Sequence, residues 1–291
     1  MSIFRNITFF GLKDKVLKIG GQSNGTYLKT GLYAILCSAG KKTAARIAEK
    51  EEQDMNPDFW QIILVTVSAA VGAWAHIKLR STFSKYAKVP CSNGITGWKA
   101  AAQLLKINNI NDVKIGPIAG SLTDHYSHTA EVKQIALSEP VYNVNSIAAV
   151  GVAAHEAGHA VQYATKYKGL SIRAPLRRFS GISSKFGPYI IMAGLFIPDY
   201  PIIMDIGIAL FSLAVLCSIL TLPVEFNASS RALAALKANN MLATPEELKG
   251  AKKVLGAAAL TYVAAALTNC VTLLGFILKR KRATQKKKRR A

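Results

Sequence analysis

Apolar residues gather in four long blocks along the chain, and these blocks predict membrane-spanning helices. Residues 59–77 carry no acidic or basic residue except His76 near the end, and they are long enough to cross a bilayer. Residues 202–222 and 254–278 are two further blocks of sufficient length. Residues 182–197 are shorter and contain a lysine and a Gly-Pro pair, so this block crosses only as one half of a hairpin with the block that follows. The pattern predicts a mainly α membrane protein with about four transmembrane helices.

The stretch between the first two blocks is polar to mixed and long enough for a small folded unit. Thr96 can cap a helix that runs to Lys106. Residues 113–115 and 132–137 are short strand candidates, separated by turn-forming Gly and Pro. We therefore expect a small α+β unit at the membrane surface.

The two ends of the chain differ in character from its middle. Residues 1–54 lack sustained periodicity, which predicts a weakly ordered extension before an embedded domain at residues 55–278. Of the 37 Lys and Arg, nine lie in residues 279–291, a basic tail that accounts for much of the net charge of +21. The tail has no aromatic residues for base stacking, so we expect a contact with the lipid bilayer and no specific nucleic-acid binding.

Residues 147–162 predict an unbroken helix, capped by Ser146 or the residue before it. His155 and His159 stand four residues apart on this helix, so both imidazoles share one face and can reach a single metal ion. Glu156 lies beside them, where it can accept a proton from a metal-bound water. The pattern is H-E-x-x-H, which is typical of zinc peptidases.

The alternative is that these side chains are solvated on an ordinary helix surface. Their neighbours are nearly all Ala, Val and Gly, which predicts a buried helix. A buried His-Glu-His cluster without a partner would cost several kcal/mol, whereas a divalent cation satisfies its polar groups. We therefore expect one Zn²⁺ ion, because imidazole and carboxylate ligands suit zinc.

A catalytic zinc site needs a third protein ligand, and His125, His128 and Glu225 are the candidates. Glu225 is favoured because it follows an apolar block, where a carboxylate has no evident structural reason to be. His125 and His128 lie in a predicted polar turn before a strand and remain second choices.

Five segments carry a family resemblance, and they are residues 79–86, 122–126, 153–160, 221–228 and 257–266. On these segments the chain resembles the YugP-type zinc-dependent membrane peptidases of bacteria, over about three quarters of its length. It is more distantly similar to the HtpX-type membrane proteases. The resemblance implies a zincin-like unit in which His155, His159 and Glu225 are the zinc ligands and Glu156 is the catalytic base. The chain departs from the distant relatives at Ser229, where they carry an aspartate, so Asn227 or another group has to orient the histidines.

These observations predict a membrane-bound zinc metalloendopeptidase that acts on membrane or membrane-proximal polypeptides. The resemblance suggests that residues 132–137 hold an extended substrate by pairing along a strand edge. The alternative is a non-catalytic membrane scaffold that the metal only braces. A transporter is disfavoured because no charged residue lies in the middle of a predicted span. The sequence leaves the oligomeric state open.

The charges around the spans give conflicting indications of sidedness in the multi-pass cell-membrane protein that we expect. Basic residues follow the first span and precede the second, whereas the loop between the second and third spans carries only acidic ones. The positive-inside rule then places the zinc unit on the cytoplasmic face. With four crossings the basic tail would lie outside, which the same rule disfavours. We give more weight to the early spans and expect a cytoplasmic active site.

Overall fold

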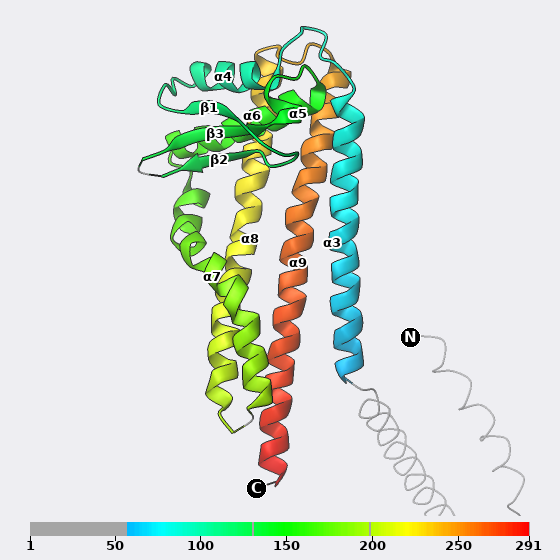
Figure 1. Cartoon of the computed structure of the whole chain (residues 1–291), viewed down its shortest axis with the longest axis vertical. Helices are drawn as coiled ribbons and strands as arrows, with labels where there is room; N and C mark the ends of the chain where they lie inside the picture. Colours follow the sequence, from blue (N-terminus) through cyan, green and yellow to red (C-terminus); the bar gives the residue numbers. More distant parts are fainter. Residues whose placement is uncertain (1–56, 130, 198, 291) are drawn as a thin grey trace, which may run out of the picture. The chain divides into compact units, whose positions relative to one another are not determined.

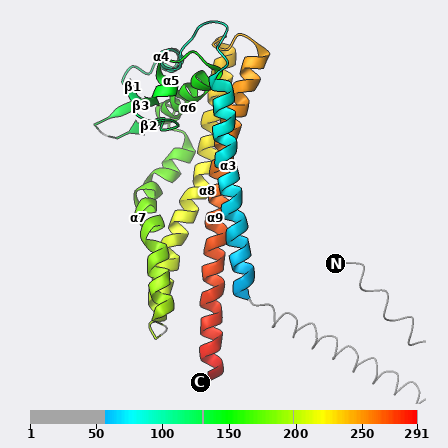
Figure 2. The same cartoon turned by 45° about the vertical axis from the view of Figure 1, so that its right-hand side comes forward.

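The computed structural model describes residues 57–129, 131–197 and 199–290, so the predicted extension at residues 1–54 lies outside the described residues. Residues Trp60–Ala291 make one compact unit. Within it, the long helices α7 (Lys168–Phe196), α8 (Pro201–Ala238), α9 (Pro245–Arg290) and α3 (Pro57–Ala87) follow one another side by side in that order (Figures 1 and 2). A small α/β part lies at one end of these long helices, along the direction of their axes. The prediction of a mainly α protein with a small α+β unit is confirmed.

Three helices in the described part of the chain are long and apolar enough to cross a membrane, and they are Gln61–Ala87, Pro201–Ala238 and Pro245–Gln285. They contain the first, third and fourth predicted blocks. The second block, residues 182–197, belongs to α7, which is long enough at 29 residues but is not among these three helices. Lys185 and the serines around it interrupt the apolar stretch. Three of the four expected spans therefore meet these criteria, and a crossing by the second block, which packs along α8, stays a prediction.

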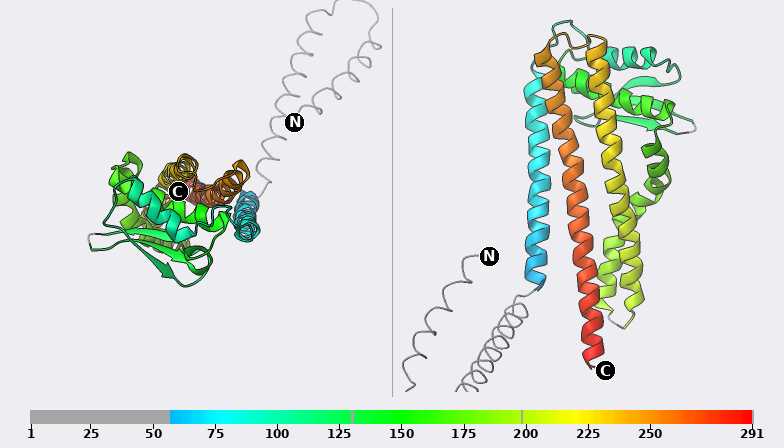
Figure 3. Two further views of the ribbon diagram at one scale, coloured as in Figure 1. Left: turned by 90° about the horizontal axis from the view of Figure 1, so that it is seen from above. Right: turned by 180° about the vertical axis from the view of Figure 1, so that it is seen from behind.

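The α/β part combines three helices with a three-stranded sheet. Its helices are α4 (Gly97–Ile107), α5 (Glu139–Tyr142) and α6 (Ile147–Ala164), and its strands are β1 (Lys114–Ile118), β2 (His125–His128) and β3 (Lys133–Ser138). The strand order is β1-β3-β2, with β1 parallel and β2 antiparallel to β3. Seen from above, the sheet and these helices lie together beside the end of the long helices (Figure 3).

The sheet corrects two predictions. Residues 125–128 form a strand, although their polar character had indicated a turn; polar side chains are compatible with an edge strand because one of its faces is exposed. The predicted strand at 132–137 corresponds to β3, which is the central strand and has a partner on each side. Pairing of a substrate along β3 is therefore wrong, and within the described sheet β2 presents a free edge.

Helix α6 forms where the sequence predicts it and lies in the middle of the main core. The Ser146 hydroxyl accepts a hydrogen bond from the Ala149 amide at 3.2 Å and caps the helix. Asn145 instead accepts a hydrogen bond from the Cys91 amide at 3.0 Å, which ties the start of α6 to the segment that follows α3. The small residues of α6 are buried and let it pack against α4, α8 and α9.

One glycine brings α6 and α8 especially close. A Cβ atom added at Gly158 would lie 2.8 Å from the backbone oxygen of Ala228. No side chain can be accommodated there without moving one helix from the other. The spacing of these two helices at the H-E-x-x-H motif therefore depends on Gly158.

At the end of the long helices that lies away from the α/β part, α9 continues as a helix through most of the predicted basic tail, to Arg290. Arg280 pairs with Asp205 near the start of α8 through two contacts of 2.7 Å, from Nε and Nη2. This bidentate pair joins the ends of α8 and α9. The predicted tail is therefore an extension of the last helix.

Candidate metal centre

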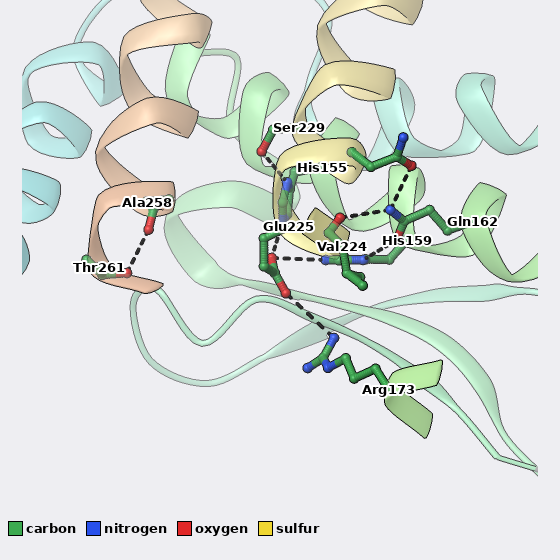
Figure 4. A network of polar contacts seen from close by, with 10 residues as sticks. His155, His159, Gln162, Arg173, Val224, Glu225, Ser229, Ala258 and Thr261 are labelled. Carbon is green, nitrogen blue, oxygen red and sulfur yellow. Dashed lines mark hydrogen bonds and ion pairs between the residues drawn. The ribbon is translucent and has the colours of Figure 1, made fainter. Parts of the chain in front are cut away.

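Two helices bring the three expected ligands together. His155 and His159 come from α6, and Glu225 comes from α8 just after Pro223. Glu225 Oε2 lies 3.3 Å from Nε2 of His155 and 3.4 Å from Nε2 of His159. Figure 4 shows both imidazoles directed at this carboxylate. The three residues offer ligand atoms that all lie within 4.8 Å of one another and could hold a metal ion.

The spacing and chemistry of this group fit zinc. Ligands placed about 2.0–2.1 Å from a tetrahedral ion lie about 3.3–3.4 Å apart, which matches the two His–Glu distances. Glu225 is 5% exposed, and its Oε2 atom is buried without a hydrogen-bond partner. A buried carboxylate oxygen without a partner is costly unless a cation satisfies it. Two imidazoles and one carboxylate also leave a fourth position for water.

A chain of hydrogen bonds fixes the orientation of His159. Arg231 Nε can only donate, and it donates to Asn227 Oδ1 at 2.8 Å. Gln162 Nε2 donates to the same oxygen at 2.9 Å and to the Val224 carbonyl at 2.8 Å. The Oε1 atom of Gln162 therefore faces Nδ1 of His159, 3.0 Å away, and accepts a hydrogen bond from its N–H group. This arrangement leaves the Nε2 lone pair of His159 directed toward Glu225 and available to a metal.

His155 has a simpler partner. Its Nδ1 atom lies 3.1 Å from the hydroxyl of Ser229. Ser229 can therefore fix the His155 ring itself. Asn227, the expected substitute, contacts neither histidine directly and reaches His159 only through Gln162.

Glu156 follows His155 on α6 and is also buried, with 7% of its surface exposed. Burial raises the pKa of its carboxyl group, and the positive charges that His155 and His159 can carry oppose that shift. A carboxylate whose pKa is raised toward neutrality is suited to take up and return a proton.

Arg173 and Gln162 are site residues that the sequence did not reveal. Arg173, from α7, places Nη1 3.8 Å from Oε1 of Glu225, and its Nε atom is buried without a partner (Figure 4). Tyr262, from α9, also interacts with the Glu225 carboxylate. The spacing of three residues between His159 and Gln162 is a weak signal in the sequence. No spacing in the sequence indicates that Arg173 lies near Glu225.

His125 and His128, the other candidates for a third ligand, lie outside the group of three. His125 is exposed, and its Nδ1 atom lies 2.9 Å from the carbonyl of Thr123. His128 accepts or donates a hydrogen bond with the Tyr126 hydroxyl at 2.8 Å and stacks on Tyr163, with ring centroids 4.2 Å apart.

Residues 61–281 match the family described as "Putative neutral zinc metallopeptidase". The chain belongs to this family. It is also 43% identical over 217 residues to the "Putative membrane protease YugP" of Bacillus subtilis (strain 168), a similarity that covers 75% of this chain and 95% of the relative. No solved structure matches the chain. Membership identifies a zinc protease with zinc as its cofactor, and the apolar helices agree with a membrane location.

Proposed function

We propose that the chain is a membrane-bound zinc metalloendopeptidase whose reaction takes place between α6 and α8. The observation that carries this proposal is the convergence of His155, His159 and Glu225 on one point, with the buried Glu156 on the same helix. In this proposal the first three residues hold one zinc ion.

Zinc bound there would polarise the scissile carbonyl and lower the pKa of a bound water. Glu156 takes the proton from the attacking water and later delivers it to the leaving amine. The raised pKa of Glu156 supports both transfers because burial makes its carboxyl group a stronger proton acceptor than an exposed glutamate. Gln162 and Ser229 hold the two imidazoles so that each keeps Nε2 toward the ion.

Arg173 acts in this proposal as a positioning residue. Its guanidinium faces Oε1 of Glu225, whereas the two imidazoles face Oε2. Attraction of Oε1 toward Arg173 leaves Oε2 for the metal and keeps a coordination position open for water.

The free edge of β2 is the proposed seat of the substrate. Helix α6 packs against β2, so an extended chain paired with this edge would pass beside the metal centre. Main-chain pairing reads the backbone and requires no free terminus, which favours cleavage within a polypeptide. The apolar helices keep the site near the bilayer, so membrane or membrane-proximal polypeptides are the proposed substrates.

We also propose that the protein crosses the membrane several times with its metal centre on the cytoplasmic face, because Lys78, Arg80 and Lys85 follow the first apolar segment. A cysteine introduced at Ser121, which is exposed, should resist an impermeant thiol reagent in intact cells. Strong labelling would place the α/β part outside.

The reaction is tested with the full chain purified in detergent and fluorescently labelled casein as an unstructured substrate. The wild type should cleave casein, lose activity with a chelator and regain it with zinc. Glu156→Gln should keep one zinc per chain and lose activity by at least about a hundredfold. Glu131→Gln, an exposed glutamate in the same part of the fold, is the matched control and should match the wild type. Cleavage by Glu156→Gln contradicts the mechanism, and zinc without any cleavage by the wild type indicates a metal-braced scaffold.

A further inference from the structure

A cationic hollow of about 490 Å³ lies between α3 and α9, close to the α/β part of the protein. Three lysines line it, Lys78 and Lys85 from α3 and Lys253 from α9. The hydroxyl residues Ser81 and Thr82 line it as well, and the lining includes no acidic side chain. The two helices stand side by side in opposite views of the molecule (Figures 1 and 3).

The hollow lies where both helices change from apolar to basic surface. On α3, Trp74 and Ile77 are 54% and 66% exposed, and the next residue is Lys78. On α9, exposed apolar side chains including Leu267 follow Lys253 by several turns. Exposed apolar surface on a membrane helix faces the acyl chains, so the lysines stand at the level of the lipid headgroups.

The floor of the hollow is open at Gly256. A Cβ atom added there would meet nothing within 4 Å. On the other side of Gly256 a second hollow of about 660 Å³ runs between α8 and α9. Its lining is mostly apolar, with Leu255 and Val263 among the residues, and also includes Ser229, Ser230, Lys237 and Lys252. The two hollows share Gly256 and Leu260. A ligand with an anionic head and an apolar chain would place its head in the lysine-lined hollow and its chain in the mostly apolar one.

We propose that the cationic hollow binds the phosphate headgroup of an anionic phospholipid, with an acyl chain lying across Gly256. Three ammonium groups and the Thr82 hydroxyl supply donors to a phosphate, whereas the Ser81 hydroxyl donates to the Lys78 carbonyl. Basic pockets between membrane helices are typical sites for anionic lipid heads. A zwitterionic lipid brings an ammonium or choline group of its own, which the lysines disfavour. This site does not depend on the peptidase reaction.

Native mass spectrometry of the full chain in detergent tests the proposal, with dioleoyl phosphatidylglycerol, dioleoyl phosphatidylcholine and inorganic phosphate as separate probes. Phosphatidylglycerol should form a one-to-one adduct at concentrations at which the other two do not. Replacing Lys78, Lys85 and Lys253 with Gln should weaken this adduct by about fivefold for each lysine, roughly a hundredfold in all.

Two further variants keep the outcome decisive. Gln substitutions at Lys99, Lys106 and Lys114 remove the same charge from exposed positions on α4 and β1 that do not line the hollow, and binding should change less than about twofold. Gly256→Leu keeps every lysine but fills the open floor, and it should abolish the adduct even if the triple lysine variant fails to fold. Equal binding of the two lipids, full binding by free phosphate, or unchanged binding by Gly256→Leu overturns the proposal.

Discussion

The two ends of the long helices differ in how their apolar residues are covered. The metal-centre end, made of α4–α6, the sheet and residues 224–242, has a single large core in which α6 is almost wholly buried. The hairpin end, residues 182–222 of α7 and α8, has a small core around Ile191 and Phe211, and many of its large apolar side chains are exposed. The protein itself makes the interior at the first end, whereas lipid has to cover the second. Polar groups with defined partners are therefore concentrated at the metal-centre end.

Removal of a proposed ligand should have the largest effect and should be confined to the metal-centre end. We expect Glu225→Ala, His155→Ala and His159→Ala each to weaken zinc binding by more than about a hundredfold. This loss is larger than the one expected when a residue that only hydrogen-bonds a ligand is removed. Competition with a chromophoric chelator measures this affinity. His125→Ala and His128→Ala are the controls and should bind zinc as the wild type does. Wild-type affinity in Glu225→Ala would move the third ligand elsewhere.

Two glycines sharpen the comparison between the ends. Gly158→Ala forces α6 away from the Ala228 carbonyl and should destabilise the protein by about 1–3 kcal/mol while also weakening zinc binding. Gly194→Ala meets Met204 in the hairpin with similar crowding, at 2.6 Å from its amide nitrogen, and should lower stability but leave zinc affinity unchanged.

Gly151→Ala is the control on α6, because the added Cβ would make an ordinary 3.4 Å contact with Ala251. It should be neutral or gain up to about 1 kcal/mol from helix propensity. Thermal unfolding in detergent and zinc titration separate the three variants. Loss of zinc binding in Gly194→Ala would show that the two ends are coupled.

The partners of the two histidines should differ in importance. Gln162→Ala removes the acceptor of His159 and takes one donor each from the Val224 carbonyl and from Asn227 Oδ1, which keeps Arg231, so zinc affinity should fall by about 10- to 100-fold. Ser229→Ala removes one neutral hydrogen bond to His155, and its effect should lie at or below the low end of that range. Zinc titration of both variants measures the difference, and the reverse order would contradict the hydrogen-bond chain.

Substitution of Arg173 should have the smallest effect on zinc affinity and a larger effect on catalysis. Its guanidinium is 3.8 Å from Glu225 and partly exposed, so Arg173→Gln should lower zinc affinity only a few-fold. We expect kcat to fall more than KM rises, and Arg173→Lys to recover part of the loss by restoring the charge. A pure KM effect would instead make Arg173 a substrate contact.

Local patterns predicted the parts of the fold that depend on local chemistry. Helix α6 follows from its cap, its small residues and the absence of proline, and the H-E-x-x-H spacing places both histidines on one face. The strand β2 was missed because an edge strand tolerates polar residues. The block at 182–197 was expected to cross only as one half of a hairpin, and α7 does pack along α8, although Lys185 and the serines keep α7 out of the helices that are apolar enough by composition.

The contacts around the site could not be predicted because they join distant parts of the chain. Gln162 acquires its role from residues of α8 that lie more than sixty positions away. Arg173 meets Glu225 only because α7 folds back along α8. The motif indicates the ligands, whereas the groups that orient them come from the packing of helices.

X-ray absorption at the zinc K-edge of the purified full chain can identify the ligands of the ion that we propose two histidines and a glutamate hold. We expect one zinc per chain, imidazole scattering from two histidines, and only nitrogen and oxygen neighbours at about 2.0–2.1 Å. Glu225→Ala should either lose the metal or show altered metal neighbours. Sulfur neighbours at about 2.3 Å, or a wild-type spectrum without imidazole scattering, would contradict this ligand set.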